Sequence, residues 1–322
     1  MTFDEIQSAI SDELVQFQKI FDTAFNTKEE YLKSIMKHVQ KQKGKQIRPI
    51  FILLCAKICG TPTLSTYQMA SALELLHTAS LIHDDVVDNT DMRRGQQSVN
   101  NLFDNKTAIL VGDYLLSKAL NFAAETDSSQ QNKFLAALGV TLSRGELLQL
   151  QHSYSIPAEE DYIDIIRKKT AILFETCAKC AALSVGATQA QTDALVQYAD
   201  ALGICFQIKD DIFDYTPDAQ IGKPTLNDIR EGKITLPLLH ALRQMSHSDA
   251  SRVLEAVKNN QFTEDFFYNI GVLIARYNGI EYASNKIEDY AAKGIEALAV
   301  FEDSEMKETL KALLRYVINR TK

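Results

Sequence analysis

The sequence contains few of the residues that interrupt regular secondary structure. Glycine and proline together account for 19 of its 322 residues, about half of the roughly 12% that is usual in proteins. A chain with so few turn-forming residues is expected to have long elements and short connections, which favours helices. Period-2 alternation bounded by turn residues is also lacking, so we expect no substantial sheet.

Long apolar runs and an excess of basic charge are absent as well. The apolar runs are far shorter than the roughly 20 residues that a helix needs to cross a bilayer. The first stretch, MTFDEIQSAISDEL, is acidic and amphipathic and does not have the pattern of a signal peptide. The formal net charge of −8 offers no basic stripe to a nucleic acid. We therefore expect a protein that is not integral to a membrane and does not bind nucleic acid.

The cysteines are odd in number and lie in apolar, helix-like contexts. They are Cys55, Cys59, Cys177, Cys180 and Cys205. Although CAKIC and CAKC could suggest a metal site, structural zinc sites have turn residues around their thiolates. We interpret the five as buried reduced thiols and expect a cytoplasmic location.

Apolar residues recur with helical spacing through nearly the whole chain. Helices are predicted at residues 3–23, 28–41, 50–59, 65–89, 104–125, 129–152, 159–185, 188–215, 235–246, 249–258, 263–276, 280–297 and 303–319. Loops are predicted at 44–49 and 216–227. Because there is no repeat, low-complexity tract or linker, we expect a single all-α domain spanning residues 1–322 around one core of long helices.

Two identical acidic motifs follow apolar helices. The pattern D-D-x-x-D occurs as Asp84, Asp85 and Asp88 and again as Asp210, Asp211 and Asp214. Acids at a helix C-terminus meet the negative end of the macrodipole, so something positive must compensate them. One such cluster could be a solvated helix end, but two are hard to explain in that way. Carboxylate oxygens favour Mg²⁺, which usually shares its coordination with substrate phosphates.

Basic residues lie close to these motifs in the sequence. Lys45 and Arg48 belong to GKQIRP, Arg93 and Arg94 follow the first motif, Lys169 lies in RKKTAILF, and Lys223 and Lys233 follow the second motif. A lone lysine or arginine is usually surface charge. Gathered beside the acidic motifs, these cations would suffice for two polyanionic groups, which indicates Mg²⁺-dependent chemistry on phosphate esters.

An ordered set of motifs resembles the trans-isoprenyl diphosphate synthase (polyprenyl synthetase) family. The matching stretches are GKQIRP, ELLHTASLIHDDVVDNTDMRRG, LVGDYLLSKAL, RKKTAILF, FQIKDDIFDY and GKPTLNDIREGKITLP. The resemblance implies an all-α bundle of helices around a central cavity, usually in a homodimer. It also implies Mg²⁺-dependent condensation of isopentenyl diphosphate with an allylic diphosphate.

The resemblance also assigns roles to residues. The six aspartates would hold Mg²⁺ on the allylic diphosphate. The partners of that diphosphate would be Arg93, Lys169, Thr170, Gln207, Lys223 and Lys233, with Lys169 and Lys233 among the catalytic residues. The site for isopentenyl diphosphate would comprise Lys45, Arg48, His77 and Arg94. Apart from the resemblance, His77 could be a hydrogen-bonded core residue. One departure is Phe103-Asp104-Asn105, where family members commonly have Phe-Gly-Asn.

Product length in this family depends on how far an apolar tunnel extends below the first aspartate. Short-chain members tend to have a large aromatic residue four or five positions before it. Here these positions are Ser80 and Ala79, and Leu76, Leu73 and Ala72 lie further along the helix. The floor is expected in DYLLSKALNF, at Tyr114, Leu115 or Phe122. We therefore expect a medium-to-long all-trans product, around octaprenyl diphosphate, with a farnesyl or geranylgeranyl product as the alternative.

Three other classes of protein share part of this pattern. A di-iron bundle needs Glu-x-x-His on two helices plus two further glutamates, and ELLH occurs once. A terpene cyclase would normally have a different second motif. A non-catalytic subunit of a prenyltransferase tends to lose aspartates or cations, and this chain keeps them.

Overall fold

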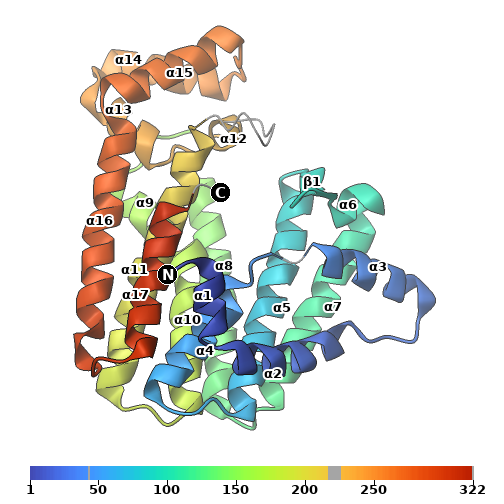
Figure 1. Cartoon of the computed structure of the whole chain (residues 1–322). Coiled ribbons are helices and arrows are strands. Elements are labelled where there is room, and N and C mark those ends of the chain that lie inside the picture. Colours follow the sequence, from blue (N-terminus) through green and yellow to red (C-terminus); the bar gives the residue numbers. More distant parts are fainter. Residues whose placement is uncertain (43, 217–225, 321–322) are drawn as a thin grey trace. The chain divides into compact units, whose positions relative to one another are not determined.

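The computed structural model describes the whole chain except residues 43, 217–225 and 321–322 (Figure 1). It is helical nearly throughout, which confirms the all-α prediction. The described residues include one small sheet, in which β1 (Met92–Arg93) pairs antiparallel with β2 (Gln96–Gln97). Within the described ranges, no helix is both long enough and apolar enough to span a membrane.

The chain divides into two compact units. Unit 1 comprises Met1–Ala137, Thr176–Val196 and Val300–Ala312, and unit 2 comprises Leu138–Glu175, Gln197–Ala299 and Leu313–Lys322. Four helices contribute residues to both units: α8 (Ser129–His152), α10 (Ile172–Ser184), α11 (Gln189–Asp214) and α17 (Glu305–Asn319). That residues 1–322 act as one domain stays a prediction.

Unit 1 contains the N-terminal helices and the small sheet. Its further elements are α1 (Phe3–Ser8), α2 (Ser11–Phe21), the 3₁₀ turn η1 (Asp22–Phe25), α3 (Glu30–Lys41), α4 (Ile47–Cys59), α5 (Leu64–Val87), α6 (Val99–Leu102) and α7 (Asn105–Ala124). Helix α5 is buried on most of its circumference, which explains why its sequence is apolar on nearly all faces. It packs along α7, which begins at a capping aspartate: Asp104 Oδ1 accepts a hydrogen bond from the Thr107 amide at 2.7 Å.

Unit 2 contains a helix that is interrupted by a π-helical turn, followed later in the chain by the helices α12 to α16. Its further elements are α9 (Glu159–Ile166), the π-helix η2 (Arg167–Ala171), α12 (Asn227–Arg230), α13 (Leu236–Gln244), α14 (His247–Lys258), α15 (Glu264–Arg276) and α16 (Gly279–Ala297), and the 3₁₀ turn η3 (Leu298–Val300) passes from unit 2 into unit 1. The core of unit 2 includes Tyr198, which is fully buried.

Several boundaries differ from those expected from the sequence. Helix α4 begins at Ile47 rather than 50, because Pro49 falls in its first turn, where the missing N–H costs no helical hydrogen bond. The helix expected at 159–185 is interrupted by the π-helix. The expected loop 216–227 lies mostly outside the described residues, and α12 begins at its last position.

Candidate active site

The first aspartate motif ends α5, and its three members have different surroundings. Asp84 and Asp88 are exposed, whereas Asp85 is 2% exposed. The guanidinium of Arg93 binds Oδ1 of Asp85, with a distance of 2.9 Å from Nε and a second, ion-pair contact from Nη2. The motif therefore presents two carboxylates to solvent and holds the third against an arginine.

A tight hairpin turn places Arg93 and its neighbour Arg94. Arg94 and Gly95 both have positive φ, 51° and 74°, as in the two-residue turns that suit a right-handed strand twist. Arg94 Nη1 donates to the Gln42 carbonyl at 2.8 Å, and its guanidinium covers Gly44, where a Cβ would lie 2.5 Å from Cζ. The arginine is thus held against the loop that contains Lys45, which is exposed.

Arg93 and Arg94 both line a small cavity in unit 1. The cavity measures about 30 Å³, room for about one water molecule. Glu74 and Arg94 line it, and burial raises the pKa of Glu74 although Arg48 and Arg94 oppose the change. Burial first, and then Arg48, Arg94 and Arg93, lower the pKa of His77 well below its usual value. Three of the four residues expected to bind isopentenyl diphosphate, Arg48, His77 and Arg94, therefore lie close together and form a positive site.

The second aspartate motif ends α11 in unit 2. Asp211 is 3% exposed and accepts hydrogen bonds on both oxygens, from Tyr162 Oη at 2.5 Å and from Gln207 Nε2 at 2.8 Å. Thr170 Oγ1 donates to Gln207 Oε1 at 2.6 Å, which completes a chain of four side chains. Burial raises the pKa of Asp211 to about 6. The charges of Asp210 and Asp214 act in the same direction, and the two hydrogen bonds act in the opposite one.

The other two members of the second motif have different partners. Asp210 Oδ1 accepts from Arg320 Nη2 at 2.7 Å. Asp214 accepts from the backbone amides of Asn227 and Asp228, each at 3.0 Å. Burial raises the pKa of Asp214 above its usual value, although these amides act in the opposite direction.

The π-helix η2 presents Lys169 and Thr170. The Ile172 amide donates to the Arg167 carbonyl five residues earlier, the pattern of a π-turn, which often occurs at functional sites. The ammonium of Lys169 binds Glu146 Oε2 at 2.6 Å and Gln149 Oε1 at 2.8 Å, both on α8.

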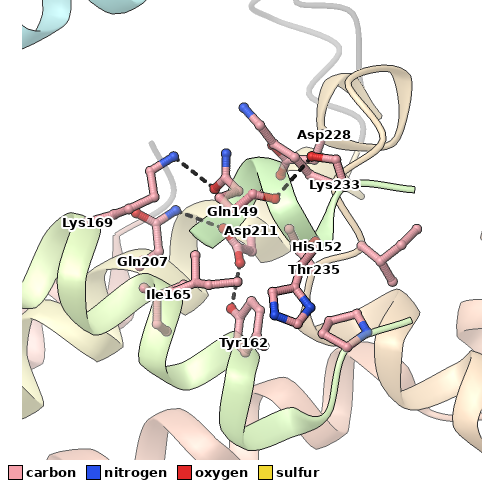
Figure 2. Close-up of a pocket in the computed structure, with 14 residues that line it drawn as sticks. Gln149, His152, Tyr162, Ile165, Lys169, Gln207, Asp211, Asp228, Lys233 and Thr235 are labelled. Atoms are coloured by element: carbon pink, nitrogen blue, oxygen red, sulfur yellow. Dashed lines mark hydrogen bonds between the residues drawn. The ribbon is translucent and has the colours of Figure 1, made fainter. Parts of the chain in front are cut away.

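These residues line a cavity of about 180 Å³ in unit 2 (Figure 2). Its polar wall contains Lys169, Gln207, Asp211, Asp228 and Lys233, and its apolar wall includes Pro157, Ile165, Ile166 and Ile234. Four residues that were expected in the site therefore line one cavity: Lys169, Gln207, Asp211 and Lys233. Thr170, also expected, is hydrogen-bonded to Gln207. Lys223 lies outside the described residues.

Tyr162 and Asp228 are two of the lining residues that the sequence did not lead us to expect. Tyr162 lies outside the matched stretches, whereas Asp228 lies within GKPTLNDIREGKITLP but was assigned no role there. The structure connects both to the second aspartate motif: Tyr162 donates to Asp211, and the Asp228 amide donates to Asp214. Burial first, then the charges of Asp211 and Asp214, raise the pKa of Asp228 well above its usual value, opposed by Lys233. In the sequence, the signal for Asp228 is its position within GKPTLNDIREGKITLP, five residues before Lys233.

The positions expected to control product length lie on α5. Ala79 is 2% exposed, and the Ser80 hydroxyl donates to the His77 carbonyl at 2.9 Å. On α7, Leu115 and Phe122 are buried and Tyr114 is partly buried.

The aspartate motifs fit Mg²⁺ in donor type and charge. They supply hard carboxylate oxygens, and in the second motif burial first, and then the charges of Asp210 and Asp214, raise the pKa of Asp211, a change that a bound cation would oppose. Among the described residues, no three His, Cys, Asp or Glu form a group that could hold a metal by itself. A bound Mg²⁺ would therefore take further ligands from water or a phosphate, as it usually does.

Comparison with known proteins gives one consistent family. The profile of the family described as Polyprenyl synthetase matches residues 29–268. The octaprenyl diphosphate synthase of Haemophilus influenzae is 33% identical over 99% of this chain and 98% of its own. The crystal structure of a decaprenyl diphosphate synthase from Rhodobacter capsulatus is similar, with a TM-score of 0.93, 29% identity and full coverage of both chains. That of a geranylgeranyl pyrophosphate synthase from Bacteroides thetaiotaomicron is also similar, with a TM-score of 0.85, 39% identity and 98% coverage of both chains.

Proposed function

Because the chain belongs to the polyprenyl synthetase family and is therefore a prenyl-transferring enzyme, we propose that it condenses isopentenyl diphosphate with an allylic diphosphate. The product is a medium-to-long all-trans polyprenyl diphosphate, around octaprenyl. The observation that carries the proposal is that each unit combines an aspartate motif with neighbouring cations: Asp85 with Arg93 in unit 1, and Asp211 with Lys169 and Lys233 around the cavity of unit 2.

The allylic diphosphate binds beside the second motif. Lys169, Thr170, Gln207 and Lys233 line or adjoin the cavity of unit 2 and provide donors for its phosphate oxygens. Lys169 is held by Glu146 and Gln149 and can exchange these acceptors for a phosphate at the cavity rim. The family resemblance assigns Arg93 of unit 1 and Lys223, which lies outside the described residues, to the same substrate.

Isopentenyl diphosphate binds in unit 1. Arg48, His77 and Arg94, with Lys45 in the adjoining loop, form its diphosphate site. Burial first, and then the neighbouring arginines, lower the pKa of His77, so its imidazole acts as a hydrogen-bond donor rather than as a charge. Glu74 balances part of the arginine charge when no diphosphate is bound.

The reaction breaks the allylic C–O bond and forms a C–C bond. When bound by the aspartates of the two motifs, Mg²⁺ would neutralise the charge that develops on the departing diphosphate. Lys169 and Lys233 stabilise the same charge, while the apolar wall of the cavity excludes water. The double bond of isopentenyl diphosphate attacks the allylic carbon, and the departing diphosphate takes up the proton that is then lost.

Exposed apolar residues and free cysteines support two further parts of the proposal, a homodimer and a cytoplasmic location. Helix α7 exposes Ile109, Leu110 and Leu120, at 45%, 58% and 53%, which suits burial in a homodimer. We propose that dimer, which sedimentation would show. All five cysteines are free, which suits a reducing compartment such as the cytoplasm.

A shorter product is the second candidate. The similarity to a geranylgeranyl pyrophosphate synthase at 39% identity favours it. Small residues at Ala79 and Ser80 favour a longer product, because each helical turn without bulky side chains leaves about 5.4 Å of depth, close to one extended isoprene unit.

Steady-state kinetics on variants of the two sites tests the proposed assignment of substrates. Arg48→Ala should raise KM for isopentenyl diphosphate, and Lys233→Ala should raise KM for the allylic diphosphate. Equal changes in both KM values in either variant would contradict the assignment.

A further inference from the structure

Asp214 fixes the backbone of the segment that follows residues 217–225. The Leu226 amide donates to the Asp214 carbonyl at 2.8 Å, the Asn227 amide to Oδ1 at 3.0 Å and the Asp228 amide to Oδ2 at 3.0 Å. Both carboxylate oxygens therefore bind amides at the start of α12, which have no partner within that helix. Hydrogen bonds from amides to a carboxylate are charge-assisted and stronger than those to a neutral acceptor.

The same segment is held at its other end by aromatic rings. The Arg230 guanidinium lies 4.1 Å from the centre of the Phe267 ring and 5.7 Å from that of Phe262, and these two rings stack on each other. The Gly232 carbonyl accepts from the Tyr154 amide at 2.8 Å. Residues 226–233 are thus fixed at the beginning by Asp214 and at the end by α15 and Tyr154.

Two residues of this segment line the cavity of unit 2. Asp228 and Lys233 reach it from the short helix and the turn after it (Figure 2). The Lys233 amide donates to the Asp228 carbonyl at 2.8 Å, so the two move together. Neither lies on a long helix, and their positions at the cavity therefore depend on the contacts that fix the segment.

We propose that Asp214 is a positioning residue that anchors residues 226–233 and thereby places Lys233 and Asp228 at the cavity. This inference rests on the proposed function and gives Asp214 a different role from the other two aspartates of the second motif. The sequence led us to expect a metal ligand at Asp214, but both of its oxygens bind the backbone of α12, so it acts through that segment.

Amide hydrogen exchange on the metal-free, full-length protein tests the anchoring directly. Asp214→Ala should speed exchange of the Asn227 and Asp228 amides by about tenfold or more, since each loses a hydrogen bond to a carboxylate. Asp214→Asn keeps one acceptor oxygen and should protect one of the two amides, whereas its Nδ2 is a donor and cannot bind the other. Ser246→Ala, which removes the cap of α14, is the matched control and should leave these amides unchanged.

Kinetics then distinguishes positioning from metal binding. Asp214→Ala should raise KM for the allylic diphosphate as Lys233→Ala does, and the double variant should be little worse than either single one. Asp214→Asn should recover activity to within about fivefold of wild type, because it retains one acceptor for the α12 amides. The Mg²⁺ concentration for half-maximal rate should stay within about twofold of wild type in all of these variants.

Three results would overturn the inference. The first is unchanged amide exchange in Asp214→Ala, and the second is an equal loss of activity in Asp214→Asn and Asp214→Ala. The third is a large rise, in both of these variants, in the Mg²⁺ concentration needed for half-maximal rate. If wild type produced no polyprenyl diphosphate, the proposed function would fail. The exchange experiment, which needs no substrate, would still decide whether Asp214 anchors the segment.

Discussion

Gly203 of α11 lies directly against Ala171 of the π-helix η2: a Cβ on Gly203 would be 2.4 Å from the Ala171 Cα. Gly145 of α8 makes a similar approach, where a Cβ would be 2.9 Å from that of Lys168. These two glycines let both helices pack closely on the segment that carries Lys169 and Thr170. Close packing is what brings Thr170 within 2.6 Å of Gln207.

Gly203→Ala should therefore disturb the site as well as the fold. The added methyl meets backbone, which cannot rotate away, so we expect a loss of about 1–3 kcal/mol in the free energy of unfolding. KM for the allylic diphosphate should rise because Thr170 and Gln207 separate. Gly139→Ala on α8 is the matched control: nothing lies within 4 Å of its Cβ, so it should be neutral or stabilising by up to about 1 kcal/mol. Denaturant melts of both variants check this, and equal stability of the two would refute it.

Tyr162→Phe should weaken the support of Asp211. It removes the donor to Oδ2 and leaves a buried carboxylate short of one hydrogen bond, which costs about 1–3 kcal/mol. Differential scanning calorimetry measures the loss. Tyr282→Phe, which removes a partly exposed hydroxyl bound to Glu159, should cost less. A Tyr162→Phe protein as stable as wild type would show that this hydrogen bond does not support the site.

The same variant should change the pH dependence of activity. The pKa of Asp211 is about 6, above its ordinary value, and the Tyr162 hydrogen bond opposes this rise. The charged carboxylate is the form that attracts a cation, so kcat/KM should fall as pH drops through this pKa. Without the hydroxyl the pKa is higher, and the acid side of the profile should move to higher pH. A shift to lower pH, or none, would contradict this account of Asp211.

Ala79→Tyr should shorten the product. Ala79 is buried on α5, and a phenol ring there would block the tunnel below Asp84. Chain elongation should stop early while the first condensation keeps nearly its normal rate, because the diphosphate sites are unchanged. Chromatography of products from farnesyl diphosphate and labelled isopentenyl diphosphate measures both. A product of unchanged length would refute the tunnel assigned to this face of α5.

Much of this architecture could be predicted from the sequence, because long apolar periodicity and repeated acids are local signals. Helices α5 and α11 and their terminal aspartates follow from that pattern. The π-helix could not be predicted, since residues 159–185 read as one continuous helix, and Gly145 and Gly203, which pack closely against the interruption, belong to other helices. Tyr162 lies in no matched stretch, and Asp228 lies in GKPTLNDIREGKITLP without a predicted role, so their places in the site become apparent only from the packing. The hairpin at 92–97 is set by a two-residue turn too short to show periodicity.

The departure at Asp104 from the usual family pattern has a local explanation. Its side chain caps α7 through the Thr107 amide, and this hydrogen bond lowers the pKa of the carboxyl. The backbone there is extended, with φ of −171°, a conformation open to any residue. Aspartate therefore replaces glycine without strain.

The most direct test of the central claim is product formation by the purified chain alone, with Mg²⁺ and with the metal removed by chelation. We expect wild type to convert farnesyl diphosphate and isopentenyl diphosphate into a polyprenyl diphosphate of around eight units with Mg²⁺, and to stop when the metal is removed. Asp84→Ala and Asp210→Ala should each lower turnover by several orders of magnitude, because they remove charge that stabilises the transition state. Asp193→Ala, an exposed aspartate on α11, should behave as wild type. Near-normal turnover in either motif variant, or product without metal, would contradict the account.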